Sequence, residues 1–166
     1  MREKKIPIIT LLIICFFVSI TYCEDVVDYK KQSEEKCREV VEMIKKFGAI
    51  LTFKELNKKK GRFVWEDSYV YTIDIKKGII LSHNDRSFVG KLVSDIKNIN
   101  GRKIYREFMK MGETKGSGWI SYIWKENRRR KHELKYSFVM KIPGQDILVI
   151  SSTYDKQKPA PKKAKN

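Results

Sequence analysis

The side chains best able to bind a small polar molecule are spread over the second half of the chain. Near neutral pH a histidine can donate or accept a hydrogen bond, and a lysine in a partly apolar cavity recognises a carboxylate as a point charge. Tyrosine and tryptophan supply both apolar walls and hydrogen-bond donors. The candidate ligand-binding residues of these types are Tyr69, Tyr71, His83, Trp119, Tyr122 and Lys135.

Each candidate also has a structural explanation. A histidine can cap a loop, a lysine can point to solvent in a lysine-rich chain, and a single aromatic residue commonly packs in the core. Alternate residues of a strand point to the same side. Tyr69 and Tyr71 should therefore share one face of their strand, whereas Trp119 and Tyr122 should lie on opposite faces unless the strand is bulged.

The sequence contains no convincing catalytic or metal-binding pattern. His83 and His132 have no cysteine or carboxylate at metal-ligand spacing, and Cys37 has no histidine nearby in the sequence. The glycines of residues 112–118 lie at no strand-to-helix transition, so they form no phosphate-binding motif. We therefore expect a binding protein that is not an enzyme and that holds no cofactor or metal.

Five strands are predicted from runs of aromatic and β-branched residues that are separated by turn-forming residues. Short connections favour antiparallel pairing between consecutive strands, as for the turn at Lys76, Lys77 and Gly78. The predicted strands are residues 63–74, 79–83, 117–124, 134–142 and 147–154.

Helices are predicted before the sheet and inside it. Apolar or small residues recur every three or four positions from 26 to 47, and Gly48 is placed to end that helix. Thr52 and Glu55 suggest a capping box for a short helix through Asn57. Residues 84–115, with a helix at 103–112, should cross one face of the sheet and roof a cavity. The predicted fold is therefore mixed α+β, with a long N-terminal helix and a helical crossover that covers one face of a five-stranded antiparallel sheet.

The N-terminus has the composition of an export signal. A basic stretch precedes fifteen residues, 6–20, that are almost entirely apolar and fewer than the ~20 that a spanning helix needs. Tyr22 is too bulky for a clean cleavage site, so the signal could be cleaved, lipid-modified at Cys23 or retained as an anchor. Pairing of Cys23 with Cys37 in a disulfide is also left open. The expected division is a signal at 1–23, a helical segment at 24–60, a domain that contains the predicted sheet at 61–155 and a disordered lysine-rich tail at 156–166.

The chain is strongly basic, with 36 lysines and arginines against 20 acidic residues and a net charge of +16. Dense runs lie at 58–60 and 128–131, where loops are expected, and such fields attract anions. A solvated surface explains most of this charge, and no specific nucleic-acid partner is expected. The alternative function is a cationic interaction protein that holds an anionic polymer or surface through residues 128–131 and the tail. Such binding should weaken steeply with salt.

Several motifs occur together in the order that is typical of one family. Residues 69–74 (YVYTID) form an aromatic strand ending in aspartate, and residues 81–83 (LSH) form a strand ending in histidine. Residues 118–122 (GWISY) and Lys135 with Ser137 continue the series. Over about a hundred residues the chain thus resembles the single Cache domains, extracytoplasmic relatives of PAS domains that serve as ligand-binding sensors in bacteria. Departures from the family pattern, which put pocket size and ligand identity in question, occur at Asn84, Phe138, Ile147, Ile150 and Ser152.

The resemblance implies a PAS- and Cache-like sheet and an exported protein, periplasmic or extracellular, that reversibly binds a small polar metabolite. A short carboxylate is the first choice of ligand, because the resemblance places Lys135 on a central strand under the helical cover. No second apolar segment and no output domain follow in this sequence. We therefore expect a separate membrane receptor or other signalling partner, and membrane contact only through the N-terminal segment if it is uncleaved.

Overall fold

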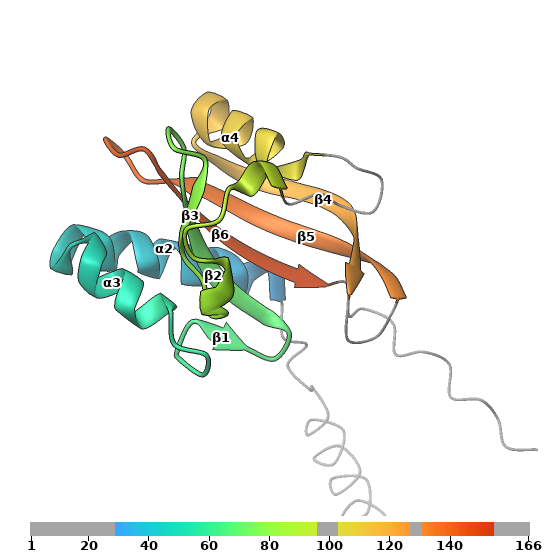
Figure 1. Cartoon of the computed structure of the whole chain (residues 1–166), viewed down its shortest axis with the longest axis horizontal. Coiled ribbons are helices and arrows are strands. Elements are labelled where there is room, and N and C mark those ends of the chain that lie inside the picture. Colours follow the sequence, from blue (N-terminus) through green and yellow to red (C-terminus); the bar gives the residue numbers. More distant parts are fainter. Residues whose placement is uncertain (1–28, 96–102, 127–130, 155–166) are drawn as a thin grey trace, which may run out of the picture.

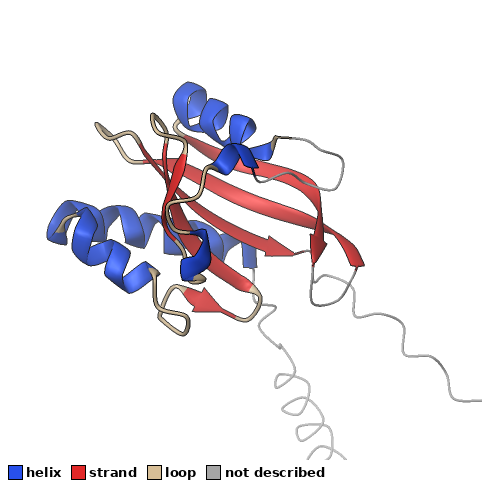
Figure 2. Cartoon of the chain, viewed as in Figure 1, coloured by secondary structure: helices blue, strands red, loops and turns tan. Residues whose placement is uncertain are grey.

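The computed structural model describes residues 29–95, 103–126 and 131–154, and these form one α+β unit around a single antiparallel sheet. Helices lie on both faces of this sheet (Figures 1 and 2). The helices are α2 (Tyr29–Phe47), α3 (Ala49–Leu56) and α4 (Ile104–Lys115), and the strands are β1 (Val64–Trp65), β2 (Ser68–Asp74), β3 (Ile79–Ser82), β4 (Ser117–Glu126), β5 (Lys131–Lys141) and β6 (Ile147–Tyr154).

The strand order is β1-β2-β6-β5-β4, and β3 also pairs with β2. Because β6 occupies one edge of β2, the short strands β1 and β3 share the other edge, each pairing with a different part of it. The last strand of the chain thus lies in the middle of the sheet, between β2 and β5. The predicted α+β class and antiparallel pairing are confirmed.

The predicted strand at 63–74 is two strands. Glu66 has a positive φ of 46°, and the chain turns back there so that Trp65 pairs with Ser68. This φ lies in the left-handed region, which a continuing strand does not enter. The sheet therefore has six strands rather than the five predicted, with β1 as a two-residue addition at its edge.

Gly48 ends the N-terminal helix as predicted, with a φ of 81° that a side chain would strain. The predicted capping box at Thr52 is wrong. Helix α3 already begins at Ala49, so Thr52 lies inside it, and its Oγ1 donates a hydrogen bond to the carbonyl oxygen of Gly48 at 3.0 Å. The crossover helix, predicted at 103–112, continues to Lys115.

Two apolar clusters hold the layers together. One lies between the sheet and α2 with α3, and it contains Val40, Leu56 and Phe138. The other lies between the sheet and the crossover, which is formed by α4 and by two short 3-10 helices, η1 (Arg86–Phe88) and η2 (Val93–Asp95). Among the described residues, the buried members of both clusters come from positions 37–150.

Several features that were singled out in the sequence lie outside the described residues. These are the export signal, Cys23, the arginines of the 128–131 run and the lysine-rich tail. Cys37 is fully buried in α2, and burial raises the pKa of its thiol. Among the described helices, none is long and apolar enough to cross a membrane.

Candidate ligand-binding cavity

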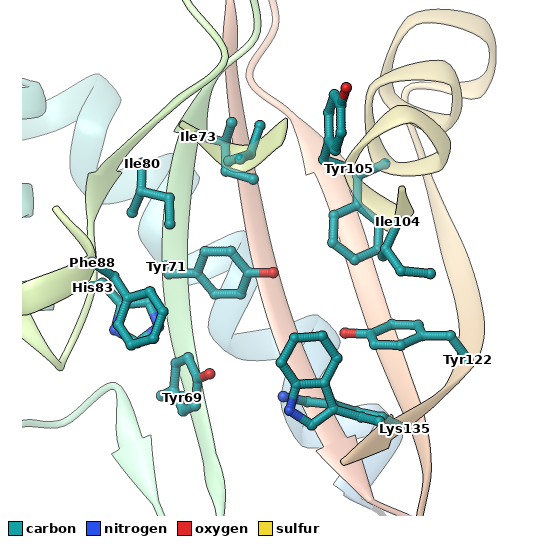
Figure 3. A pocket seen from close by; sticks show the side chains of 13 residues that line it. Tyr69, Tyr71, Ile73, Ile80, His83, Phe88, Ile104, Tyr105, Tyr122 and Lys135 are labelled. Carbon is teal, nitrogen blue, oxygen red and sulfur yellow. The ribbon is translucent and has the colours of Figure 1, made fainter. Parts of the chain in front are cut away.

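A cavity of about 90 Å³ lies between the sheet and the crossover. Its floor comes from β2, β3, β4 and β5, and its cover from η1, η2 and α4. Figure 3 shows the side chains converging from these elements, which are far apart in the sequence. The lining residues are Tyr69, Tyr71, Ile73, Ile80, His83, Phe88, Val93, Ile104, Tyr105, Phe108, Tyr122, Trp124 and Lys135.

Five of the six candidate residues from the sequence meet in this cavity: Tyr69, Tyr71, His83, Tyr122 and Lys135. Tyr69 and Tyr71 share one face of β2, with ring centroids 5.9 Å apart. The period-two rule gives this arrangement directly, because the intervening Val70 packs on the opposite side of the sheet in the α2 cluster.

Trp119 is the sixth candidate, and the structure places it on the other face of the sheet. Its ring packs against Phe138 at a centroid distance of 5.3 Å. Its Nε1 donates a hydrogen bond to Oε1 of Glu34 in α2 at 2.7 Å. Strand β4 is regularly paired with β5 through this region, without a bulge that would turn the indole over. Trp119 therefore fastens α2 to the sheet and does not line the cavity.

His83 is buried, at 7% exposure, and its ring is held by its own loop. Nδ1 accepts a hydrogen bond from the backbone N–H of Asp85 at 2.9 Å. Burial lowers the pKa of His83 to about 4, and the charge of Lys135 acts in the same direction against the opposing charge of Asp85. The ring is consequently neutral near pH 7 and carries its proton on Nε2, so that it is a hydrogen-bond donor.

The Tyr69 ring packs edge-on against His83 at a centroid distance of 4.7 Å. Phe88 of η1 lies at the same distance on the imidazole ring. These contacts limit the rotation of His83, and the backbone N–H of His83 donates to Oδ1 of Asn57 at 2.9 Å. The loop-capping role and the ligand-binding role predicted for His83 are therefore compatible, because they use different nitrogen atoms.

Lys135 is the most unusual side chain of the site. It is only 5% exposed. Its Nζ lies 5.6, 5.4 and 5.3 Å from the ring centroids of Tyr69, Trp124 and Tyr154. No carboxylate of the described residues forms an ion pair with it. Aromatic faces attract a desolvated cation by about 2 kcal/mol, whereas burying an ammonium without an anion costs considerably more. The site therefore favours an anion.

Phenol groups add further donors. Figure 3 shows the Tyr71 and Tyr122 hydroxyls pointing toward one another across the cavity. The Tyr122 hydroxyl is 2.9 Å from Oγ of Ser137, which is in turn 2.8 Å from Oγ of Ser152. Burial raises the pKa of Tyr69 to about 12 and raises the pKa of Tyr71 well above 10. Both phenols therefore keep their protons at physiological pH.

Trp124 and the cover residues belong to the lining although they were not among the predicted ligand-binding residues. Trp124 lies two positions after Tyr122 and thus on the same strand face, so the alternation rule was sufficient to find it. Phe88, Ile104 and Phe108 come from the crossover. The sequence predicted that the crossover would roof a cavity, but which of its side chains would line it depends on tertiary packing.

A wider depression of about 910 Å³ adjoins the cavity and shares Tyr69, Trp124 and Lys135 with it. Lys135 thus borders both spaces. The outer depression is more polar than the inner cavity, and its charged lining residues besides Lys135 are Lys59, Lys60, Arg86, Glu66, Asp67 and Asp85. Tyr69, Trp124 and Lys135 thus lie at the boundary between the two spaces.

The described parts of the chain contain no group of three or more histidine, cysteine, aspartate or glutamate residues that could hold a metal ion. The donors of the cavity are a neutral imidazole, phenols and one ammonium group, on a largely apolar wall. Such a set can bind a small anion by charge and by hydrogen bonds.

Solved structures with a similar fold were found among bacterial sensor domains. A methyl-accepting chemotaxis protein from Vibrio parahaemolyticus RIMD 2210633 superposes with a TM-score of 0.62 at 20% identity, covering 78% of this chain and 90% of that one. A structure described as the periplasmic sensor domain of a chemotaxis protein gives 0.59 at 17% identity, covering 78% and 99%. One described as showing carboxylic acid recognition by a Cache chemosensory domain gives 0.60 at 17% identity, covering 81% and 99%.

At these identities the structural likeness establishes the fold alone. No curated protein matches the chain significantly. The family profile is decisive, because the profile of the family described as "Single Cache domain 2" matches residues 24–161 and so includes α2, α3 and the whole sheet. The chain therefore belongs to the single Cache domain 2 family of sensor domains.

Proposed function

We propose that this Cache domain reversibly binds a small monocarboxylate outside the cytoplasm and so senses it. The observation that carries the proposal is the buried Lys135 ammonium, which borders the cavity and has no carboxylate partner among the described residues. A carboxylate would supply the missing negative charge. The neutral Nε2–H of His83 and the protonated phenols would donate hydrogen bonds to it.

The size of the cavity limits the ligand. A dry cavity of about 150 Å³ holds benzene, which suggests roughly four non-hydrogen atoms for a cavity of about 90 Å³. Acetate has four non-hydrogen atoms, and propionate has one more. The apolar part of the lining, which includes Ile73, Ile80 and Ile104, suits a short aliphatic tail. A similar fold in a structure described as showing carboxylic acid recognition by a Cache domain supports the same ligand class.

The compartment and the signalling role are part of the proposal. The basic stretch and the apolar run of residues 6–20 support export. The likeness to a periplasmic sensor domain of a chemotaxis protein supports a periplasmic or extracellular location. We propose that ligand occupancy is passed to a membrane receptor or another signalling partner. The alternative cationic interaction function rests on residues 128–131 and the tail, and neither the described structure nor the comparisons favour it.

A thermal-shift screen tests the ligand class. The protein to use is the chain without residues 1–23, which keeps every core residue that the structure describes. At 100 times its Kd a ligand stabilises the native state by about 2.7 kcal/mol. Acetate and propionate should raise Tm, whereas acetamide and propionamide, which have the same shape without the charge, should not. Equal effects of acid and amide would exclude recognition through Lys135. A response to neither, or only to large polyanions with a steep salt dependence, would favour the alternative.

A further inference from the structure

The corner between α2 and α3, which has an exposed apolar tip, lies at one end of the described fold (Figure 1). It consists of Phe47, Ile50 and Leu51, which are 50%, 75% and 57% exposed. These are the highest exposures among the large hydrophobic residues that the structure describes. Three adjacent apolar side chains held in water are costly, and such patches commonly mark an interaction site.

Lysines surround this tip. Residues 45–54 contain three lysines and no acidic residue. Lys45 pairs with Glu42, and Lys58 pairs with Glu55. Lys46, whose Nζ lies 5.1 Å from the Phe47 ring centroid, and Lys54 have no carboxylate partner among the described residues. Lys54 follows Ile50 by four positions and so shares its side of α3.

The first turn of α3 adds a third feature. Its N-cap is Gly48, and no described side chain caps the backbone N–H groups that follow. The N-terminus of a helix carries a partial positive charge and binds phosphate groups. Apolar side chains, unpaired lysines and uncapped N–H groups therefore lie together at one corner of the fold.

We propose that the α2–α3 tip binds an anionic lipid surface. Phe47, Ile50 and Leu51 insert at the boundary between headgroups and acyl chains, while Lys46 and Lys54 meet the anionic headgroups. Basic segments with apolar residues bind membranes by this combination of burial and charge. Ile50 is 75% exposed and therefore projects from the surface. A fluid lipid surface can accommodate a projecting side chain, whereas a protein partner would need a cavity of matching shape. A second copy of the chain is a poor occupant, because two lysine-rich corners repel each other.

Vesicle binding by the chain without residues 1–23 tests the proposal, and an Ile50→Cys variant carries an environment-sensitive dye. Cys37 is buried, so labelling is confined to position 50. On vesicles that contain phosphatidylglycerol the dye should shift to the blue, and a quencher in the acyl chains should reach it. The matched control is a dye at Leu92→Cys, a residue that is 49% exposed and lies outside the tip. That dye should not respond.

Substitutions complete the test. Phe47→Ser, Ile50→Ser and Leu51→Ser together should reduce vesicle binding at least tenfold, whereas Val89→Ser with Leu92→Ser should leave it unchanged. Replacing Lys46 and Lys54 by glutamine should weaken binding roughly fivefold for each lysine. Binding of the triple variant that equals the unaltered chain, or no dye shift at position 50, would overturn the proposal in favour of binding through other lysines. If analytical ultracentrifugation finds a dimer of the unaltered chain that the triple substitution abolishes, the tip contacts another copy instead. An absence of vesicle binding by the unaltered chain would also exclude the proposal.

Discussion

The ammonium group of Lys135 lies 5.6 Å from the ring centroid of Tyr69, although β6 separates their strands in the sheet. The side chains reach one another over Ser152 and Tyr154 of β6, which pair directly with Tyr69 and Lys135 respectively. The small side chain of Ser152 leaves room above the central strand, and the Tyr154 ring lies against the ammonium group. The middle of the sheet therefore forms the floor of the cavity. The positive charge of Lys135 lies where the cavity meets the outer depression.

Replacement of Lys135 by methionine should separate ligand binding from stability. Methionine keeps much of the bulk and removes the charge. The Kd for a short carboxylate should increase by the equivalent of about 2–5 kcal/mol, as when one member of a buried charge pair is lost. The free domain should be unchanged or more stable, because no described carboxylate loses a partner. Isothermal calorimetry and urea unfolding measure the two effects.

Lys77→Met in the exposed turn between β2 and β3 is the matched control, and it should alter neither quantity. Unchanged carboxylate affinity in Lys135→Met would show that the ligand does not use this ammonium group. The difference in affinity between propionate and propionamide should also disappear in Lys135→Met, because the amide never used the charge.

His83 should make the stability of the domain depend on pH. Its pKa falls from 6.5 to about 4 on folding. Between these values the unfolded chain binds a proton that the folded chain does not. The free energy of unfolding should therefore decrease as the pH falls from about 6.5 to about 4, by at most about 1.4 kcal/mol per pH unit, and this loss should be absent above pH 6.5.

Urea unfolding of the unaltered chain and of His83→Gln at several pH values between 4 and 7 checks this. Glutamine cannot gain the proton, so the difference in stability between the two proteins should change over this range. Both proteins keep the same carboxylates, so the contributions of these carboxylates to the pH dependence of stability largely cancel when the two proteins are compared. A constant difference would mean that His83 titrates at its ordinary pKa in the folded protein.

The sequence was sufficient for most of the strands and for part of the candidate site, and the reasons are local. The alternation of Tyr69 and Tyr71 follows from strand geometry alone. The same rule predicted that Trp119 and Tyr122 lie on opposite faces of the sheet. The unbroken pairing of β4 with β5 confirms this arrangement. The turn at Glu66 was missed because a non-glycine residue with positive φ has no strong sequence signal.

The cover and the burial of Lys135 depend on contacts between distant segments. Lysines occur throughout this chain, so composition could not distinguish Lys135 from a solvated lysine. Its burial depends on Tyr69, Trp124 and Tyr154, which come from three other parts of the sequence. Likewise, Thr52 and Glu55 match a capping box, but Gly48 allows the helix to begin earlier at Ala49.

Two tryptophan variants distinguish the two faces of the sheet. Trp119→Phe removes the hydrogen bond to Glu34 and should reduce the free energy of unfolding by about 1–3 kcal/mol. Its Kd for the ligand should stay within about twofold, since the indole lies outside the cavity. Trp124→Phe removes part of the cavity wall and the indole face next to Lys135, so its Kd should increase. Calorimetry decides the matter. Equal losses of affinity in both variants would contradict the assignment of Trp119 to the α2 face.

Gly112 in α4 provides a test of how closely the cover packs on the sheet. A Cβ at this position would overlap Cδ2 of Leu148, a fully buried residue of β6. Alanine inside a helix gains about 1 kcal/mol over glycine, but overpacking in a core typically costs 1–3 kcal/mol. Because Leu148 has no space to withdraw, the clash should dominate. Gly112→Ala should then destabilise the domain by up to about 2 kcal/mol in urea unfolding.

The same substitution should weaken ligand binding, because a displaced α4 moves Ile104 and Phe108 away from the cavity. Gly118→Ala is the matched control. There the new methyl group would meet the side chain of Met111, which is only partly buried and can rotate. Its effect on stability should therefore be smaller than that of Gly112→Ala. A stabilising effect of Gly112→Ala would show that helix propensity outweighs the contact, and that α4 rests less tightly on β6 than the structure indicates.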